Sequence, residues 1–118
     1  MEKLIIVGGI EKTFRSNGAT PIKYRRLFKG ADFFRDMMGM RNIDPENMSD
    51  EEIERIEKLA FAMCEDSNLP DMTFEKWMEQ FELFDVFNAA PEIMGLVTEN
   101  LETQAIPNKS KNAEPAES

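Results

Sequence analysis

Short apolar stripes at helical spacing, each bounded by a capping residue, a glycine or a proline, dominate the sequence from residue 20 onward. The clearest start signal is Ser49 followed by Glu52, because this spacing lets the hydroxyl and the carboxylate each satisfy a free backbone amide of the first turn. The apolar face after it continues to about Asp66 and consists of Ile53, Ile56, Ala60 and Met63. The sequence therefore predicts a mainly α fold.

Two helices are predicted before this one. Thr20 followed by Pro21 indicates a helix start, since threonine caps free amides and proline suits the first turn. This helix is expected to end near Lys29. A second apolar stripe predicts a helix from Phe33 to about Arg41, and the asparagines and proline of residues 42–47 then predict a loop.

Two more helices are predicted after residue 70. Thr73 caps the first, whose apolar face consists of Phe74, Trp77, Met78, Phe81 and Phe84. Because proline disfavours helical geometry in the residue before it, we expect a break around residues 85–91. The last helix is expected to begin at Pro91 and to carry Ile93, Met94, Val97 and Leu101.

Two β-prone runs, residues 3–7 and 10–15, precede the helices. Gly8 and Gly9 separate them and tolerate the positive φ angles of a tight hairpin turn. A lone hairpin is marginal in water, so it must pack on the helices or pair with another chain through its edge. At the other end, residues 106–118 lack large apolar side chains beyond Ile106 and are expected to be disordered. We expect one mainly α domain over residues 1–105, with an N-terminal β-hairpin over about 3–15, about five short helices and a disordered C-terminal tail.

Composition excludes several kinds of site. The 118 residues include one cysteine, Cys64, and no histidine, so a disulfide framework, the usual zinc sites and the common Cys–His and Ser–His–Asp catalytic groups are absent. A calcium loop starting at Asp66 would place Pro70 at position 5 and Trp77 where the bidentate glutamate belongs. We therefore expect no catalytic residue, no cofactor and no metal site, and without a run of about 20 apolar residues we expect no membrane span.

Charge is divided unevenly along the chain. The formal net charge is −9, but residues 1–48 hold nine Lys/Arg and six Asp/Glu, whereas residues 49–105 hold three and fifteen. The acidic excess argues against nucleic acid as a partner, because phosphate binding depends on clustered cations. The basic segment 1–48 of one copy can contact the acidic segment 49–105 of another, in a head-to-tail arrangement. The acidic segment also leaves a second function open, that of an inhibitor that mimics the charge of DNA and binds a host protein.

Nine methionines and nine phenylalanines form the apolar inventory. Methionine is flexible and polarisable, which suits surfaces that repack against a partner. We expect an exposed groove or self-association surface, with core packing as the alternative for each candidate. The candidate contact residues are Trp77, Phe81, Phe84, Phe87, Ile93 and Met94.

Two blocks of sequence resemble a known family. Residues 24–28 (YRRLF) and 32–36 (DFFRD) resemble the "YRxxF…DLxxD" block of tail assembly chaperones from long-tailed phages and prophages of Gram-positive bacteria. The family's ending, "FEEWLDxF…DIY…PEI…N…T", is similar to FEKWMEQF, DVF, PEI and NLET at residues 74–81, 85–87, 91–93 and 100–103. The resemblance covers about residues 3–110.

The resemblance implies a small helical factor in the cytoplasm of the bacterial host, without enzymatic activity. Such a factor binds the tape measure protein during tail assembly, oligomerises around it and is absent from the finished virion; the tail tube protein is a further expected partner. The family often produces a longer product by ribosomal frameshifting. Residues 108–112 can be written in A-rich codons, so we expect a slippery run there.

Overall fold

The computed structural model of the chain describes residues 1–40, 44 and 46–100, and the side chains of all of these except 99 and 100. Its elements follow the order β1 (Glu2–Val7), β2 (Ile10–Arg15), α1 (Thr20–Leu27), α2 (Phe33–Gly39), α3 (Asp50–Met63), the 3-10 helix η2 (Glu65–Asn68), α4 (Phe74–Met78) and α5 (Asp85–Asn100). The predicted mainly α fold, with an N-terminal hairpin and five α-helices, is confirmed. No helix in the described ranges is long and apolar enough to span a bilayer. The tail predicted to be disordered, residues 106–118, lies outside the described residues.

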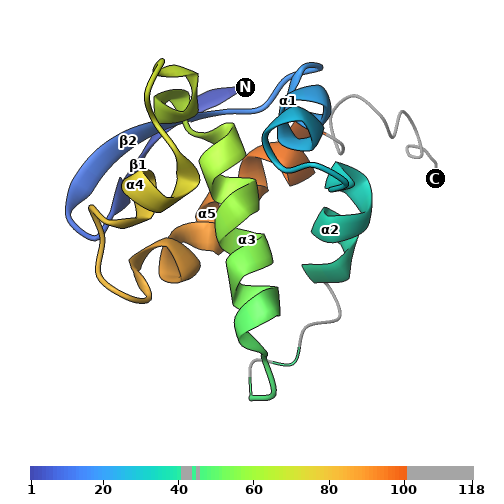
Figure 1. Cartoon of the computed structure of the whole chain (residues 1–118), viewed down its shortest axis with the longest axis vertical. Helices are drawn as coiled ribbons and strands as arrows, with labels where there is room; N and C mark the ends of the chain where they lie inside the picture. Colours follow the sequence, from blue (N-terminus) through green and yellow to red (C-terminus); the bar gives the residue numbers. More distant parts are fainter. Residues whose placement is uncertain (41–43, 45, 101–118) are drawn as a thin grey trace, which may run out of the picture.

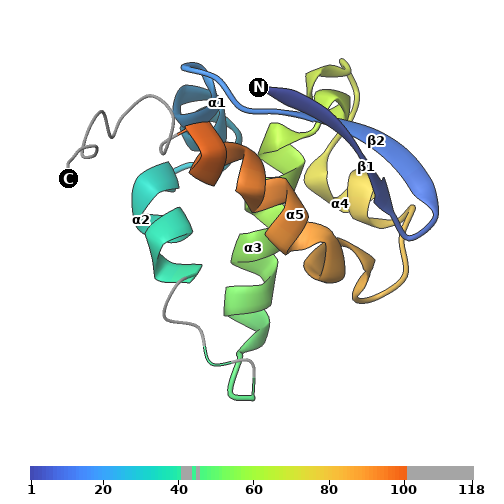
Figure 2. The same cartoon turned by 180° about the vertical axis from the view of Figure 1, so that it is seen from behind.

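Helix α3 forms the centre of the molecule. It contacts α1, α2, α4, α5, η2 and β2, and α5 crosses it on the side opposite the viewer in Figure 1 and nearest the viewer in Figure 2. Every residue from Leu59 to Met63 is buried. A helix end that is apolar on all sides must be covered on all sides, so this half of α3 collects the other elements around it.

The hairpin packs on the helices, which is the first of its two predicted arrangements. Its strands pair in antiparallel register from Glu2 opposite Arg15 to Val7 opposite Ile10, and the turn glycines have φ angles of 58° and 84°. The inner face of the hairpin consists of the buried side chains Ile5, Val7 and Phe14. Gly8 has a positive φ that strains any other residue, and a Cβ atom there would lie 2.0 Å from Oδ2 of Asp85, so a larger residue would also displace the Asp85 side chain at the start of α5.

The predicted caps of α3 and α4 are confirmed, and that of α1 is wrong. Ser49 Oγ accepts from Glu52 N at 3.2 Å while Glu52 Oε1 accepts from Ser49 N at 3.1 Å, which completes the capping box. At α4, Thr73 Oγ1 accepts from the amide of residue 76 at 3.2 Å. Thr20 lies inside α1, and its hydroxyl accepts from Asn17 N at 3.0 Å; this turn competes for the side chain that would otherwise cap the helix.

The break predicted around residues 85–91 is wrong, and so is the start of the last helix at Pro91. Helix α5 runs from Asp85 to Asn100 with Pro91 inside it. The buried side chains on both sides of the proline form one apolar stripe: Val86, Ala90, Ile93, Met94, Leu96 and Val97. Burial of this stripe outweighs the roughly 3 kcal/mol that an internal proline costs a helix. The helix before it also stops sooner than predicted, at Met78 rather than near Phe84.

Candidate functional site

Three of the six candidate contact residues lie in the core. Trp77 and Ile93 have no exposed surface, and Met94 is 8% exposed. The indole of Trp77 donates from Nε1 to Asp66 Oδ2 at 3.1 Å, and its ring meets that of Phe61 at a centroid distance of 5.3 Å. The indole therefore has its polar atom satisfied inside the protein, and these three side chains serve core packing, the alternative stated for each.

The other three candidates lie at or near the surface. Phe81 is half-buried, with its ring edge-on to Trp77 at 5.0 Å, so it covers the core. Phe84 is 50% exposed and Phe87 is half-buried, and their rings meet edge-on at 6.5 Å. Phe84 directly precedes α5, and Phe87 lies on its first turn. Each of the latter two lines a different hollow beside α3. The structure thus brings Phe84 and Phe87 together at a candidate binding surface.

The hollow beside Phe87, here called the apolar hollow, has a volume of about 300 Å³. It lies between α3, α5 and the two ends of the segment that joins α2 to α3. Among the residues that the structure describes, its lining contains no charged side chain and consists of Met40, Met48, Ile56, Phe87, Asn88, Ala90 and Pro91. Two methionines at its edge can change rotamer at little cost, so the apolar hollow can adapt to apolar side chains of different shape.

The hollow beside Phe84, here called the acid-rimmed hollow, has a volume of about 250 Å³. Its lining combines apolar and acidic side chains: Asp50, Ile53, Glu54, Glu57, Leu83 and Phe84. Leu83 is the most exposed of the large apolar side chains in the described chain, at 77%. The combination of an exposed apolar floor with carboxylates favours a ligand that carries both an apolar group and a positive charge.

Glu57 is the most unusual group of the acid-rimmed hollow. It is only 9% exposed, and within residues 1–40, 44 and 46–98 no ion pair or side-chain hydrogen bond reaches its carboxylate. Burial, together with the nearby charge of Glu54, raises the pKa of Glu57. A buried carboxylate without a partner is costly, so this position gains from any cation that enters the hollow.

Sequence reasoning missed Glu57 and Leu83. Glu57 is one of many acidic residues of α3 in the sequence, and its burial depends on neighbours that are distant along the chain, among them Leu83 and Phe84 in the same hollow. Leu83 stands between the helical positions of Phe81 and Phe84, off the predicted apolar face. A large apolar residue that fits no stripe was the available signal that this side chain would lie outside the core.

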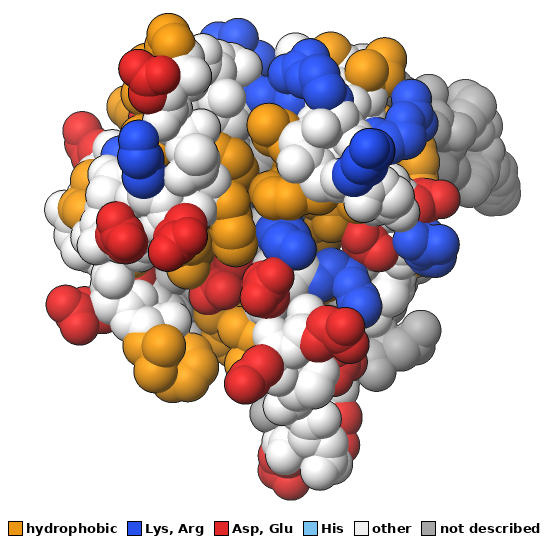
Figure 3. Space-filling model, viewed as in Figure 1, with side chains coloured by type: hydrophobic (Ala, Val, Ile, Leu, Met, Phe, Trp, Pro, Cys, Tyr) orange, Lys and Arg blue, Asp and Glu red, His pale blue; other side chains and the backbone are white. Residues whose placement is uncertain are grey.

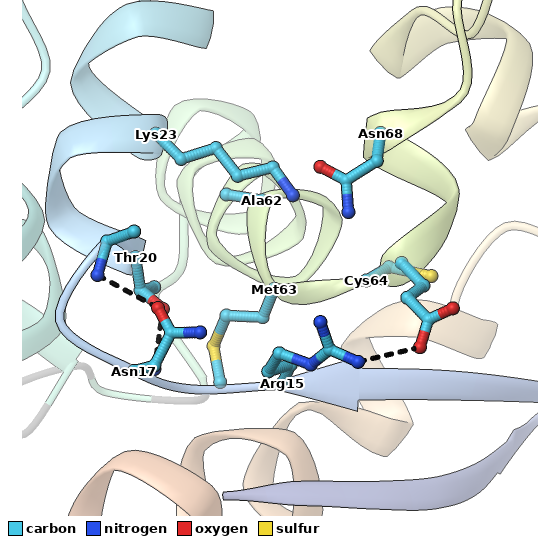
Figure 4. Close-up of a pocket in the computed structure, with 10 residues that line it drawn as sticks. Arg15, Asn17, Thr20, Lys23, Ala62, Met63, Cys64 and Asn68 are labelled. Atoms are coloured by element: carbon cyan, nitrogen blue, oxygen red, sulfur yellow. Dashed lines mark hydrogen bonds and ion pairs between the residues drawn. The ribbon is translucent and has the colours of Figure 1, made fainter.

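A third hollow, of about 150 Å³, lies where the hairpin meets α1 and the end of α3 (Figure 4). Lys23 extends across it toward Asn68, and burial lowers the pKa of this lysine. Arg15 is paired with Glu2 at 2.7 Å and with Glu65 at 3.3 Å. The hollow is small, and the positive charge of the Arg15 guanidinium is already neutralised by these two carboxylates.

Cys64 lines the same hollow, but its side chain is fully buried. Burial raises the pKa of its thiol to about 11, so at neutral pH the group is a protonated, unreactive thiol. This agrees with its interpretation as a small packed hydrophobe. In the described part of the chain, no three Cys, Asp or Glu side chains come together in a group that could hold a metal ion.

Comparison of the chain with protein-family models, with curated proteins and with solved structures finds no match.

Proposed function

We propose that this chain is a non-enzymatic tail assembly chaperone that binds the tape measure protein in the cytoplasm of a bacterial host. In this role it keeps the tape measure protein soluble, assists assembly of the tail tube and is absent from the mature virion. The sequence blocks at residues 24–36 and 74–103 support the family. The observation that carries the binding function is the apolar hollow between α3 and α5.

The chemistry of the apolar hollow suits a helical partner. A tape measure protein is expected to be a long helical chain with apolar faces that need cover until the tube polymerises around it. Helices bind in grooves through apolar side chains spaced three or four positions apart. A hollow of about 300 Å³ with Met40, Met48 and Phe87 at its walls accommodates such side chains, and its methionines tolerate a partner whose sequence varies along its length.

The acidic surface supports the solubilising part of this role. Residues 49–105 carry fifteen acidic and three basic side chains. Figure 3 shows acidic side chains around the start of α3 and over neighbouring parts of the same face. Three of them, Asp50, Glu54 and Glu57, line the acid-rimmed hollow. A complex that presents this charge to solvent repels other copies of itself and resists aggregation.

Co-expression with the tape measure protein of the same genome tests the proposal. Wild-type chain should co-purify with it and raise its soluble fraction. Phe87→Ala should lower the amount co-purified about tenfold, because it removes the aromatic side chain that lines the apolar hollow. The matched control is Phe34→Ala, since Phe34 is an equally large, exposed ring on α2 outside the hollow. Circular dichroism of each variant separates lost binding from lost folding.

If neither protein affects the solubility or purification of the other, the proposal is overturned. The remaining candidate is then the acidic inhibitor. It would compete with DNA for a host protein, and the competition would disappear at high salt because screening weakens charge mimicry.

A further inference from the structure

The carboxylate of Glu57 is less well compensated than the other two in the acid-rimmed hollow. Glu57 is 9% exposed, and within the described residues no ion pair or side-chain hydrogen bond reaches it. By contrast, Glu54 pairs with Lys58 at 3.0 Å, and Asp50 lies in the first turn of α3, where the helix dipole favours negative charge. A positive charge that enters this hollow therefore gains most at Glu57.

The surroundings of Glu57 decide what kind of cation fits. Leu83 and Phe84 line the same hollow and are 77% and 50% exposed. A small inorganic cation would leave this apolar surface uncovered, and no three acidic side chains of the described residues come together as a metal ion requires. Arginine and lysine carry their charge on an apolar stem. One such side chain can cover Leu83 and Phe84 with its methylene groups and place its charge at Glu57.

The acid-rimmed hollow and the apolar hollow are neighbours along the first half of α3. Ile53 lines the former and Ile56 the latter, three positions further along the helix. Phe84 and Phe87 are divided between the two hollows in the same way, and their rings meet at 6.5 Å. Residues three apart on a helix lie about 5–6 Å from each other, so the two hollows are about one helical turn apart.

From this arrangement we infer that the two hollows together bind one cationic amphipathic helix. Its apolar side chains enter the apolar hollow, and an arginine or lysine about one turn away enters the acid-rimmed hollow and pairs with Glu57. Glu57 is then the residue that determines specificity, because a partner without the cation leaves its buried carboxylate uncompensated. The identity of the partner rests on the proposed function: the segment of the tape measure protein that binds here carries a positive charge beside its apolar stripe.

Pairing at Glu57 differs from the general attraction between an acidic protein and a cation. Residues 49–105 hold fifteen acidic and three basic side chains, and they attract any cationic peptide over a distance. That attraction depends on the total charge, so it changes equally little whichever carboxylate is neutralised. A local pair depends on the one carboxylate that is already removed from water. Glu79, which is exposed and lines neither hollow, therefore provides a control with the same change of charge.

Calorimetric titration of the full chain with two synthetic helical peptides tests the pairing. Both peptides carry two leucines four positions apart; a turn further along, one has arginine and the other citrulline, which has the shape of arginine without its charge. Wild-type chain should bind the arginine peptide about tenfold more tightly than the citrulline peptide. Glu57→Gln should remove this preference, and Glu79→Gln should keep it. Phe87→Ala should weaken binding of both peptides alike, because the apolar hollow holds the leucines.

Three results of the titration would overturn the inference. The first is equal binding, or no binding, of the two peptides by wild-type chain. The second is an equal loss of preference in Glu57→Gln and Glu79→Gln, which would show that total charge alone attracts the peptide. The third is a Phe87→Ala variant that binds both peptides as wild type does, since the leucines would then lie elsewhere.

Co-expression with the tape measure protein separates the Glu57 pairing from the proposed function. Glu57→Gln should lower the amount co-purified about tenfold, and Glu79→Gln should leave it unchanged. Equal recovery with wild type and Glu57→Gln overturns the pairing and leaves the proposed function intact. Binding of the arginine peptide that depends on Glu57, without co-purification of the tape measure protein, overturns the proposed function and supports the site.

Discussion

The aromatic cluster around Trp77 and the pair formed by Phe84 and Phe87 are made of the same kind of side chain but differ in what covers them. The cluster is supplied by separate parts of the chain. Trp77 packs directly with Phe14 from β2, Phe61 from α3 and Phe81 after α4. Phe74 from α4 joins through Phe61, and Phe28 joins through Phe61 and Phe74. The pair is supplied by one short stretch of chain, the last residue before α5 and its first turn, with α3 as its neighbour.

The polar atoms of these two groups also differ in whether they have hydrogen-bond partners. Trp77 Nε1 donates to Asp66, and Tyr24, beside Phe28, donates its hydroxyl to Asp36 Oδ2 at 2.7 Å. Each buried polar atom of the closed cluster thus has an acidic partner. The open pair lies beside Glu57, whose carboxylate has none in the described structure. The cluster around Trp77, with complete packing and hydrogen-bonded polar groups, stabilises the fold. The Phe84 and Phe87 pair has neither, which suits it to binding.

Removing the centre of the closed cluster should have the largest effect. We expect Trp77→Ala to lower the free energy of unfolding by about 3–5 kcal/mol, because it leaves a cavity where several rings meet. Urea denaturation followed by circular dichroism measures this. Where that variant does not fold, Trp77→Phe keeps the ring contacts but loses the Nε1 hydrogen bond and should cost about 1–2 kcal/mol. Phe84→Ala in the open pair should cost less than about 1 kcal/mol; equal losses at the two positions would contradict the comparison.

Tyr24→Phe tests the polar side of the closed cluster. The side chain is buried, and we expect loss of its bond to Asp36 to cost about 1–2 kcal/mol at neutral pH. Burial and the bond to Asp36 also raise the pKa of Tyr24, so the folded chain retains a proton that the unfolded chain releases. Wild-type stability should therefore fall as the pH rises above the ordinary tyrosine pKa of 10.0, and the variant should lack that part of the fall.

The chain contains one tyrosine, so phenolate absorbance reports on this group alone. Native protein should show delayed ionisation, and urea-unfolded protein should ionise near the ordinary pKa. Ionisation at the same pH in both states would show that the hydroxyl is not enclosed.

Local sequence signals predicted most helices and strands correctly. The wrong predictions concern features that depend on contacts between residues distant in the sequence. The capping box at Ser49, the turn at Gly8 and Gly9 and the cap at Thr73 depend on residues within a few positions, and the structure has each of them. The continuity of α5 through Pro91 depends on burial against α3 and β1, which no neighbouring residue encodes. The site candidates divided for the same reason: equal helical spacing placed Trp77 in the core and Phe84 at the surface.

A change in the first turn of α3 should have a smaller effect on stability. This turn forms one wall of the acid-rimmed hollow. Ser49→Ala removes both the bond to the Glu52 amide and the hydroxyl that Glu52 contacts, and we expect a loss of about 1 kcal/mol. Relative to wild type, hydrogen exchange should accelerate more at the amides of residues 52 and 53, which are bonded to Ser49, than at those of residues 59–63. If exchange accelerated equally along the whole of α3, its two halves would open as one unit. That result would contradict the difference between the cluster around Trp77 and the surface beside Phe84 and Phe87.

Glu57→Gln should have the smallest effect on stability and the opposite sign. Because the pKa of Glu57 is raised in the folded state, the folded chain binds its proton more tightly than the unfolded chain does. Stability from this group is therefore greatest below the ordinary glutamate pKa and is lost as the pH rises through the folded value. At neutral pH the uncharged glutamine removes this loss, so the variant should be more stable by less than about 1 kcal/mol.

The measurement compares urea midpoints of dilute, monomeric wild type and variant from pH 4 upward, with the exposed Glu79→Gln as control. The gain from Glu57→Gln should grow as the pH rises and should exceed any effect of Glu79→Gln. A destabilised variant would mean that the Glu57 carboxylate already has a partner. The polar groups beside Phe84 and Phe87 would then be as fully hydrogen-bonded as those of the cluster around Trp77. A stabilised variant would show that the unpaired charge opposes folding, since the carboxylate then gains its compensation only from a cation that enters the hollow.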